Sequence, residues 1–167
     1  MMTLHKILVP VDFSPCSEAA LHHAAALAER FDAHIDVLHV WEAPKVVTME
    51  LVIPHPDSEH VLAELAHKHA EQAMQQFLRG FEKEPVLAKG RLETGDPCET
   101  ILRIASAEGY DCIVMGTHGR HGLLHLLMES VAEKVVRRSP CPVLTIRLPD
   151  VRPAEHDAAR TSSDARP

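Results

Sequence analysis

The stretch "KILVPVDFSPCSEAALHHAAALAERFDAHIDVLHVW", residues 6–41, indicates the fold class. Residues 6–13 form an apolar run rich in β-branched side chains, which predicts a strand buried on both faces. Ser14 and Pro15 then offer an N-cap and a first-turn proline, so a helix is predicted from this point. Residues 34–41 predict a second strand, and the order strand, helix, strand favours parallel neighbours joined by a right-handed crossover.

The same alternation of helix and strand signals continues along the chain. The remaining predicted elements are a helix from about Ser58, a weak strand over 85–94, a helix between Asp96 and Gly109, a strand over 111–117, a helix over 130–138 and a strand over 141–147. Asp96, Pro97 and Glu99 give the clearest local signal: an N-cap, a proline at the first helical position and a glutamate at the third. We therefore predict an α/β fold with a doubly wound, five-stranded parallel sheet and helices on both faces.

Apolar side chains at helical spacing predict which helix faces are buried. In the helix that starts near Ser58 they are Val61, Leu65, Met74, Phe77 and Phe81. In the last helix, Val131 and Val135 are expected to face the core together with Ala132. Both helices are thus predicted to pack on the sheet through one face.

Composition and charge limit the classes of function. A chain of 167 residues with 46% apolar and 25% charged residues is typical of one globular domain. Its net charge of −7 argues against nucleic acid or an anionic membrane as a partner. The sequence has no signal-peptide pattern and no apolar run long enough to span a membrane, and its four cysteines lack metal or disulfide spacing. These features predict a cytoplasmic protein.

The domain is expected to cover residues 1–148. From residue 152 onward the chain contains no Leu, Ile, Val or aromatic side chain. Such a segment cannot bury enough apolar surface to offset its ordering entropy. Residues 149–167 are therefore predicted to form a disordered tail.

Chemically distinctive residues follow two of the predicted strands. Asp12 comes at the end of the first strand, and Gly116 and Gly119 follow the fourth in the stretch "MGTHGRHGLLHLLMES", residues 115–130. In doubly wound sheets, ligands bind beyond the carboxyl ends of strands, where the strand order reverses. An aspartate there can accept hydrogen bonds from a ribose or an adenine amino group, and a glycine-rich turn before a helix lets backbone N–H groups approach phosphate. The two segments together predict a nucleotide site.

The glycine spacing in this stretch resembles a known nucleotide loop. Gly116 and Gly119, followed by nine residues and then Glu129 and Ser130, are similar to the pattern G-x-x-G, nine residues, G-[ST] of the universal stress protein family. The stretches "ILVPVDFS" near the start, "GDP" before the third helix and "SVAEKVVRRSPCPVLTIR" at the end also resemble that family. The resemblance covers about residues 4–147 and implies a Rossmann-like fold of the adenine nucleotide alpha hydrolase-like type.

The resemblance also implies a function, a ligand and an assembly. It implies a cytoplasmic stress-response protein that binds ATP or AMP, with or without Mg²⁺, as a regulatory ligand, with slow ATP hydrolysis as its highest expected activity. It further implies a homodimer through the last strand and an unidentified protein partner. By matching position, the candidate nucleotide-binding residues are Pro10, Asp12, Val40, Met115, Gly116, Gly119, Arg120, Ser130 and Val131. No residue is identified as catalytic or as a metal ligand.

Glu129 departs from the family pattern, which has glycine at this position. At about 4–5 Å its carboxylate would repel a phosphate by ~1 kcal/mol in a water-like dielectric, and its side chain takes space that glycine leaves open. The loop also lacks the lysine of a P-loop, and Arg120 supplies the nearby cation. The alternative function is therefore a stress-related protein-interaction module that binds no nucleotide because Glu129 blocks its cleft.

Several candidates also have a simpler structural interpretation. Asp12 can cap the helix that starts near Ser14, and the glycines can serve only a tight turn. Histidines in the glycine-rich stretch suggest a metal site, and cysteines at second helical positions suggest a redox role, but both interpretations are less favoured. The residues concerned are His118, His121, His125, Cys16 and Cys98.

The connection over residues 42–57 is longer than most and contains apolar clusters. We expect it to form a mobile flap beside the cleft. A packed structural loop and a dimer contact are the alternatives.

Overall fold

The computed structural model describes four stretches of the chain: residues 4–42, 58–84, 88–117 and 130–148. Within them the predicted alternation of strands and helices is confirmed. In chain order the elements are β1 (Lys6–Pro10), α1 (Pro15–Phe31), β2 (His34–Trp41), α2 (Ser58–Arg79), β3 (Ala88–Thr94), α3 (Pro97–Ala107), β4 (Cys112–Gly116), α4 (Val131–Arg138) and β5 (Val143–Ile146).

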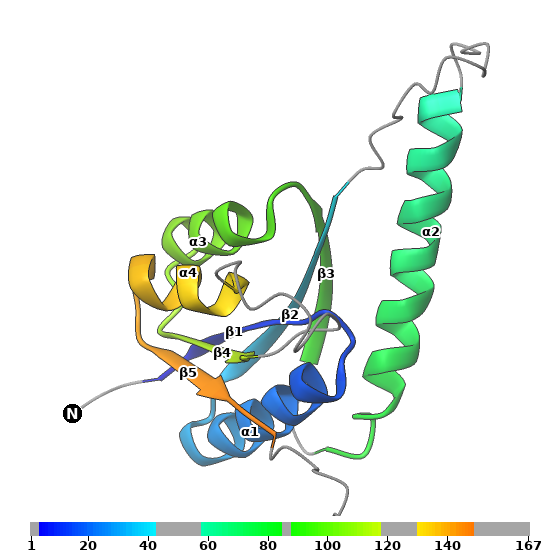
Figure 1. The fold of residues 1–167 in the computed structure, drawn as a ribbon. Coiled ribbons are helices and arrows are strands. Elements are labelled where there is room, and N and C mark those ends of the chain that lie inside the picture. The colour runs from blue at the N-terminus through cyan, green and yellow to red at the C-terminus, as the bar shows by residue number, and fades with distance from the viewer. Residues whose placement is uncertain (1–3, 43–57, 85–87, 118–129, 149–167) are drawn as a thin grey trace, which may run out of the picture.

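The strands form one parallel sheet in the order β3-β2-β1-β4-β5 (Figure 1). The central strand β1 pairs with β2, where Lys6 lies opposite His34, and with β4, where Ile7 lies opposite Cys112. The chain runs outward from β1 to β3 and then returns to β4, so the strand order reverses between β1 and β4. The last strand, β5, lies at an edge of the sheet, as predicted. The doubly wound α/β fold is therefore confirmed.

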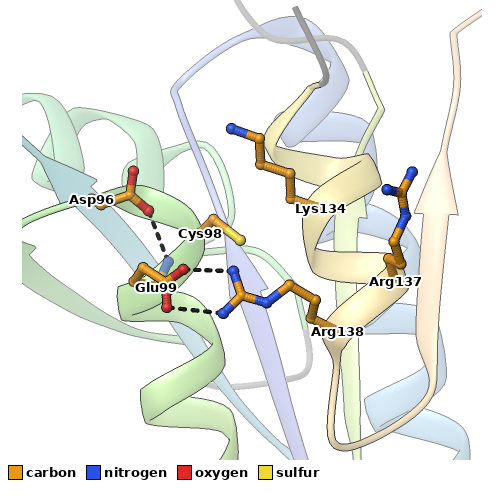
Figure 2. A pocket seen from close by; sticks show the side chains of 6 residues that line it. All are labelled: Asp96, Cys98, Glu99, Lys134, Arg137 and Arg138. Atoms are coloured by element: carbon orange, nitrogen blue, oxygen red, sulfur yellow. Dashed lines mark hydrogen bonds and ion pairs between the residues drawn. The ribbon is translucent and has the colours of Figure 1, made fainter.

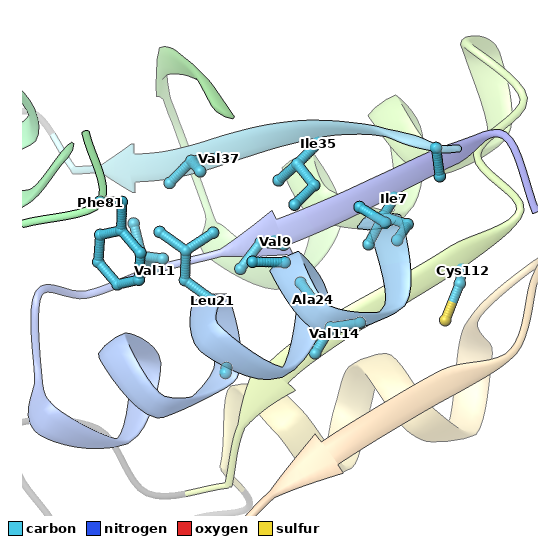
Figure 3. Close-up of a cluster of buried hydrophobic side chains, with 14 of the residues drawn as sticks. Ile7, Val9, Val11, Leu21, Ala24, Ile35, Val37, Phe81, Cys112 and Val114 are labelled. Carbon is cyan, nitrogen blue, oxygen red and sulfur yellow. The ribbon is translucent and has the colours of Figure 1, made fainter. Parts of the chain in front are cut away.

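Helices cover both faces of the sheet and enclose two hydrophobic cores (Figure 1). On one face, Leu21 and Ala24 of α1 pack over Val9 of β1 (Figure 3). On the other face, Leu8 of β1 packs in a core with Val135 of α4. Because neighbouring side chains of β1 enter different cores, the strand needs a continuous apolar run. Each fully buried aliphatic side chain of this kind stabilises the fold by about 1.5–3 kcal/mol.

Two helix starts were predicted from capping residues, and both are confirmed. The Ser14 side chain accepts a hydrogen bond from the Ser17 N–H at 3.2 Å and caps α1. The Asp96 carboxylate accepts one from the Glu99 N–H at 2.9 Å and caps α3. Such caps satisfy backbone donors that have no partner inside the helix, so short local patterns fix where these helices begin.

The predicted apolar face of α2 is only half correct. Met74 is buried against the sheet, and Phe81 is buried in the turn that follows the end of the helix at Arg79. Val61 and Leu65, in contrast, are 61% and 49% exposed. The first turns of α2 extend beyond the sheet (Figure 1). Helical spacing alone did not show how much of the helix the sheet covers.

The predicted inward orientation of Val131 in α4 is wrong. Its side chain is 38% exposed, whereas Ala132 and Val135, three residues apart on one helix face, are buried. Successive side chains of a helix point about 100° apart, so a face centred on Ala132 and Val135 leaves Val131 outside. The predicted strand over 6–13 is also too long, because β1 ends at Pro10.

Candidate functional site

The carboxyl ends of three neighbouring strands bring several of the candidate residues to one edge of the sheet. Pro10 ends β1, Val40 lies near the end of β2, and Met115 and Gly116 end β4. Because β1 pairs in parallel with both β2 and β4, these ends meet at the point where the strand order reverses. Ligands of doubly wound sheets bind at this type of position. Asp12 follows in the turn directly after β1.

Asp12 supports the first turn of α1 without being its N-cap. Its Oδ1 atom accepts hydrogen bonds from the Ser14 N–H at 3.1 Å and from the Ser14 hydroxyl at 2.6 Å. Ser14 in turn caps α1. The interpretation of Asp12 as the cap of this helix is therefore wrong: Ser14 is the N-cap, and the Asp12 carboxylate fixes that residue.

The turn between β1 and α1 also contacts β2. Phe13 has a φ of 61°, in the left-handed region that is uncommon for residues other than glycine. Its ring lies against the His39 ring with centroids 4.3 Å apart, and the His39 Nδ1 lies 2.8 Å from the Val11 carbonyl oxygen. Sequence reasoning missed His39. The available signal was a histidine in an apolar strand directly before the candidate residue Val40.

Gly116 is closely packed against α1. A Cβ atom at this position would lie 3.0 Å from the Cys16 Sγ and 3.0 Å from the Cys16 carbonyl carbon. Such contacts are tighter than nine in ten real Cβ contacts, so a side chain here would push the first turn of α1 away by a few tenths of an ångström. Met115, the residue before it, is buried in the core beneath α3 and α4. Packing thus accounts for the residue type at both positions.

One carbonyl group ties this region to the edge strand β5. The Ile146 oxygen accepts hydrogen bonds from the Thr117 N–H at 2.9 Å, the Thr117 hydroxyl at 3.3 Å and the Cys16 thiol at 3.1 Å. The end of β4 and the start of α1 are therefore joined to the end of β5. The buried Cys16 thiol acts in this structure as a hydrogen-bond donor.

The start of α4 is closed by a capping box. The Ser130 Oγ accepts a hydrogen bond from the Glu133 N–H at 3.2 Å, and the Ser130 N–H donates to the Glu133 Oε2 at 3.0 Å. The Glu133 carboxylate thus accepts the hydrogen bond of the Ser130 N–H at the helix start. Without this carboxylate, the helix start would attract a phosphate. Sequence reasoning assigned the competing carboxylate to Glu129 and overlooked Glu133.

An open cavity of about 320 Å³, lined mostly by residues with charged side chains, lies beside this region, between α3 and α4. Glu99 and Arg138 form an ion pair there, with contacts of 2.5 and 3.1 Å (Figure 2). Burial raises the pKa of the Cys98 thiol in the cavity wall, which opposes the lowered pKa that a redox cysteine needs. The cavity is lined by Asp96, Cys98, Glu99, Lys134, Arg137 and Arg138.

Several candidates lie outside the described residues. They are Gly119 and Arg120 of the glycine-rich stretch, Glu129, the histidines at 118, 121 and 125, the connection over 43–57 and the tail from 149. Among the residues that are described, no group of three or more His, Cys, Asp or Glu side chains could hold a metal ion. Over the same stretches, every helix is too short or too polar to cross a membrane.

Comparison with known proteins agrees with the fold described above. The family model of the universal stress protein family matches residues 3–147. The universal stress protein MJ0531 of Methanocaldococcus jannaschii is 32% identical over 144 residues, which are 86% of this chain and 82% of that protein. The solved structure of the protein MJ0577 has 31% sequence identity and a TM-score of 0.73, and the match covers 90% of this chain and 99% of the other.

Two solved structures of universal stress proteins hold a nucleotide. One is a complex with cAMP, at 21% identity and a TM-score of 0.62, matched over 86% of this chain and 97% of the other. The second, from Archaeoglobus fulgidus, is a complex with dAMP, at 19% identity and a TM-score of 0.58, matched over 87% and 99%. At these identities the likeness concerns the fold. Since the family model matches residues 3–147 of the 167, the chain belongs to the universal stress protein family.

Proposed function

We propose that this protein binds an adenine nucleotide, ATP or AMP, as a regulatory ligand at the carboxyl ends of β1, β2 and β4. The observation that carries the proposal is the position of Asp12, a partly buried carboxylate in the turn after the central strand, next to the reversal of strand order. Relatives of the same fold bind cAMP and dAMP, which supports an adenine nucleotide as the ligand class.

Each candidate residue has a distinct part in this proposal. Asp12 accepts hydrogen bonds from the adenosine half, and Pro10, Val40 and Met115 shape the space around it. The phosphates lie toward the start of α4, with or without Mg²⁺. There they meet Gly116, Gly119, Arg120, Ser130 and Val131. No general base is assigned, so rapid ATP hydrolysis is not expected. We further expect a cytoplasmic stress-response role that involves a protein partner.

A homodimer through β5 is part of the same proposal. β5 is an edge strand, and Leu144 at its centre is 39% exposed. An exposed apolar edge strand offers unpaired backbone groups to another chain. A second copy related by a two-fold axis would cover this edge.

A protein-interaction module that binds no nucleotide is the second candidate function. It is favoured by Glu129 at the glycine position of the family pattern and by the Glu133 carboxylate on the Ser130 N–H. Replacement of Glu129 by glycine separates the two functions. If Glu129 only weakens nucleotide binding, Glu129→Gly tightens ATP binding by about 1–2 kcal/mol. This gain in binding free energy shrinks as the salt concentration rises. If Glu129→Gly binds no nucleotide either, the interaction module is favoured.

Thermal unfolding tests the proposed function. A ligand that binds only the folded state raises Tm, by an amount that grows with ligand concentration. We expect ATP and AMP to raise Tm and UTP, which lacks adenine, to leave it unchanged. Equal shifts with all three nucleotides would indicate non-specific anion binding, and no shift with millimolar ATP or AMP would reject nucleotide binding.

A further inference from the structure

We infer that His39 of β2 is a positioning residue for the nucleotide site, because it holds the turn that presents Asp12. The inference deepens the proposed function and rests on it. Sequence patterns pointed to Asp12 and Val40, whereas the contacts of His39 with Val11 and Phe13 arise only in the fold, where the end of β2 lies beside the turn after β1.

His39 contacts the residues on both sides of Asp12. Its Nδ1 lies 2.8 Å from the Val11 carbonyl oxygen, and its ring packs on the Phe13 ring with centroids 4.3 Å apart. A carbonyl oxygen can only accept a hydrogen bond, so Nδ1 carries the proton and donates. The backbone before Asp12 and the side chain after it are therefore both fixed by one residue of the neighbouring strand.

The backbone at this turn needs such support. Phe13 has a φ of 61°, a conformation that costs free energy for any residue with a Cβ atom. The Phe13 ring is held between the His39 ring and the Phe77 ring of α2, whose centroid lies 5.5 Å away. This packing keeps Phe13 in the left-handed conformation and so sets the direction in which the chain leaves Asp12.

Asp12 connects the turn that His39 contacts to the start of α1. The Asp12 Oδ1 atom accepts hydrogen bonds from the N–H and the hydroxyl of Ser14, which caps the helix. The turn is thus fixed by β2 on one side and by α1 on the other. Loss of the His39 donor would release the Val11 carbonyl and loosen the carboxylate that the proposed nucleotide uses.

Two variants separate the effect of the His39 Nδ1 donor from that of the His39 ring, and a third variant is the control. His39→Phe keeps a ring against Phe13 and removes the Nδ1 donor, whereas His39→Asn places an amide N–H near the same position and removes the ring. His34→Phe, at the exposed start of the same strand, is the matched control. Far-UV circular dichroism and thermal unfolding establish that each variant is folded before it is compared.

Affinity for ATP is then measured for each variant in the native and in the Asp12→Ala background. We expect His39→Phe to weaken binding about tenfold, His39→Asn to recover part of that loss and His34→Phe to bind as the unmodified protein does. The tenfold effect should fall below about twofold when Asp12 is already alanine, because His39 acts through Asp12. Equal effects in both backgrounds, or no effect of His39→Phe, would overturn the inference while leaving nucleotide binding intact.

Amide hydrogen exchange of Ser14 in the absence of nucleotide provides a second readout. Its N–H donates to Asp12, so His39→Phe should speed its exchange at least tenfold while the core strand β1 stays protected. If the unmodified protein binds no nucleotide, the proposed function fails, and this exchange alone decides whether His39 holds Asp12. Faster exchange of the Ser14 amide in His39→Phe supports the inference that His39 positions Asp12, and unchanged exchange overturns it.

Discussion

A Cβ atom on Gly116 would lie 3.0 Å from the Sγ atom of Cys16. Gly116 ends the strand β4, and Cys16 lies in the first turn of α1, so this contact sets how closely the helix approaches the sheet beside the proposed nucleotide site. The glycine is therefore part of the scaffold whether or not a phosphate approaches its backbone.

Gly116→Ala should destabilise the protein by about 1–3 kcal/mol, the usual cost of overpacking a closely packed contact. Urea unfolding measures the loss. Adding Cys16→Ala should recover only part of it, because the backbone carbon of residue 16 remains equally close. A Gly116→Ala protein as stable as the unmodified one would show that α1 shifts away without cost.

Asp111 should make the stability depend on pH in the acidic range. Its carboxylate accepts hydrogen bonds from the backbone N–H groups of His5, at 2.7 Å, and Lys6, at 2.9 Å, and these bonds hold the pKa of Asp111 below its ordinary value. A lowered folded-state pKa stabilises the protein above the unfolded-state pKa, near 3.9. That stabilisation disappears as the pH falls through the folded-state pKa.

Asp111→Asn should therefore lower the free energy of unfolding by about 1 kcal/mol at pH 7 and flatten the loss of stability below about pH 4. Urea unfolding at several pH values measures both effects. Glu29→Gln, which removes an exposed carboxylate of α1, is the control. An acid transition in Asp111→Asn as steep as in the unmodified protein would contradict the prediction.

Glu133→Gln should tighten ATP about two- to fivefold and leave adenosine unchanged. The glutamine keeps a capping-box acceptor for the Ser130 N–H but removes the negative charge from the helix start. ATP is affected because its phosphates are proposed to lie there. Calorimetric titrations with both ligands provide the comparison. Equal changes in the affinity for ATP and for adenosine would show that Glu133 does not act on the phosphates.

Leu144→Lys should weaken the proposed dimer at least tenfold, because it places a charge on the exposed edge strand β5 and opposite its copy. Sedimentation velocity at several protein concentrations measures the change. Val61→Lys replaces an exposed apolar side chain on α2 and should leave the assembly unchanged. A monomer at all micromolar concentrations of the unmodified protein would reject the dimer itself.

The fold was predictable because its signals are local. Apolar β-branched runs marked the strands, and the caps Ser14 and Asp96 marked where two helices begin. The orientation of α4 was not predictable, because Val131, Ala132 and Val135 are all apolar and an eight-residue helix has too few positions to choose between faces. The exposure of the start of α2 was not predicted, because the helical spacing of apolar side chains does not show how far the sheet extends along the helix.

The candidate site was predictable only in part. Asp12 was recognisable from its place at a strand end, but its bond to Ser14 and the contact of His39 with the turn depend on packing between distant segments. The tight packing at Gly116 likewise comes from Cys16, one hundred residues earlier in the chain. Local sequence patterns do not specify tertiary contacts of this kind.

Calorimetric titration of the unmodified protein and of Asp12→Ala with ATP and Mg²⁺ tests the proposed nucleotide site most directly. We expect measurable binding by the unmodified protein and a loss of about 1–3 kcal/mol in Asp12→Ala, the range for removing a hydrogen bond to a charged group. Asp32→Ala, at the far end of α1, should bind as the unmodified protein does. Unchanged affinity in Asp12→Ala, or no binding by the unmodified protein, would contradict an adenine nucleotide held by Asp12.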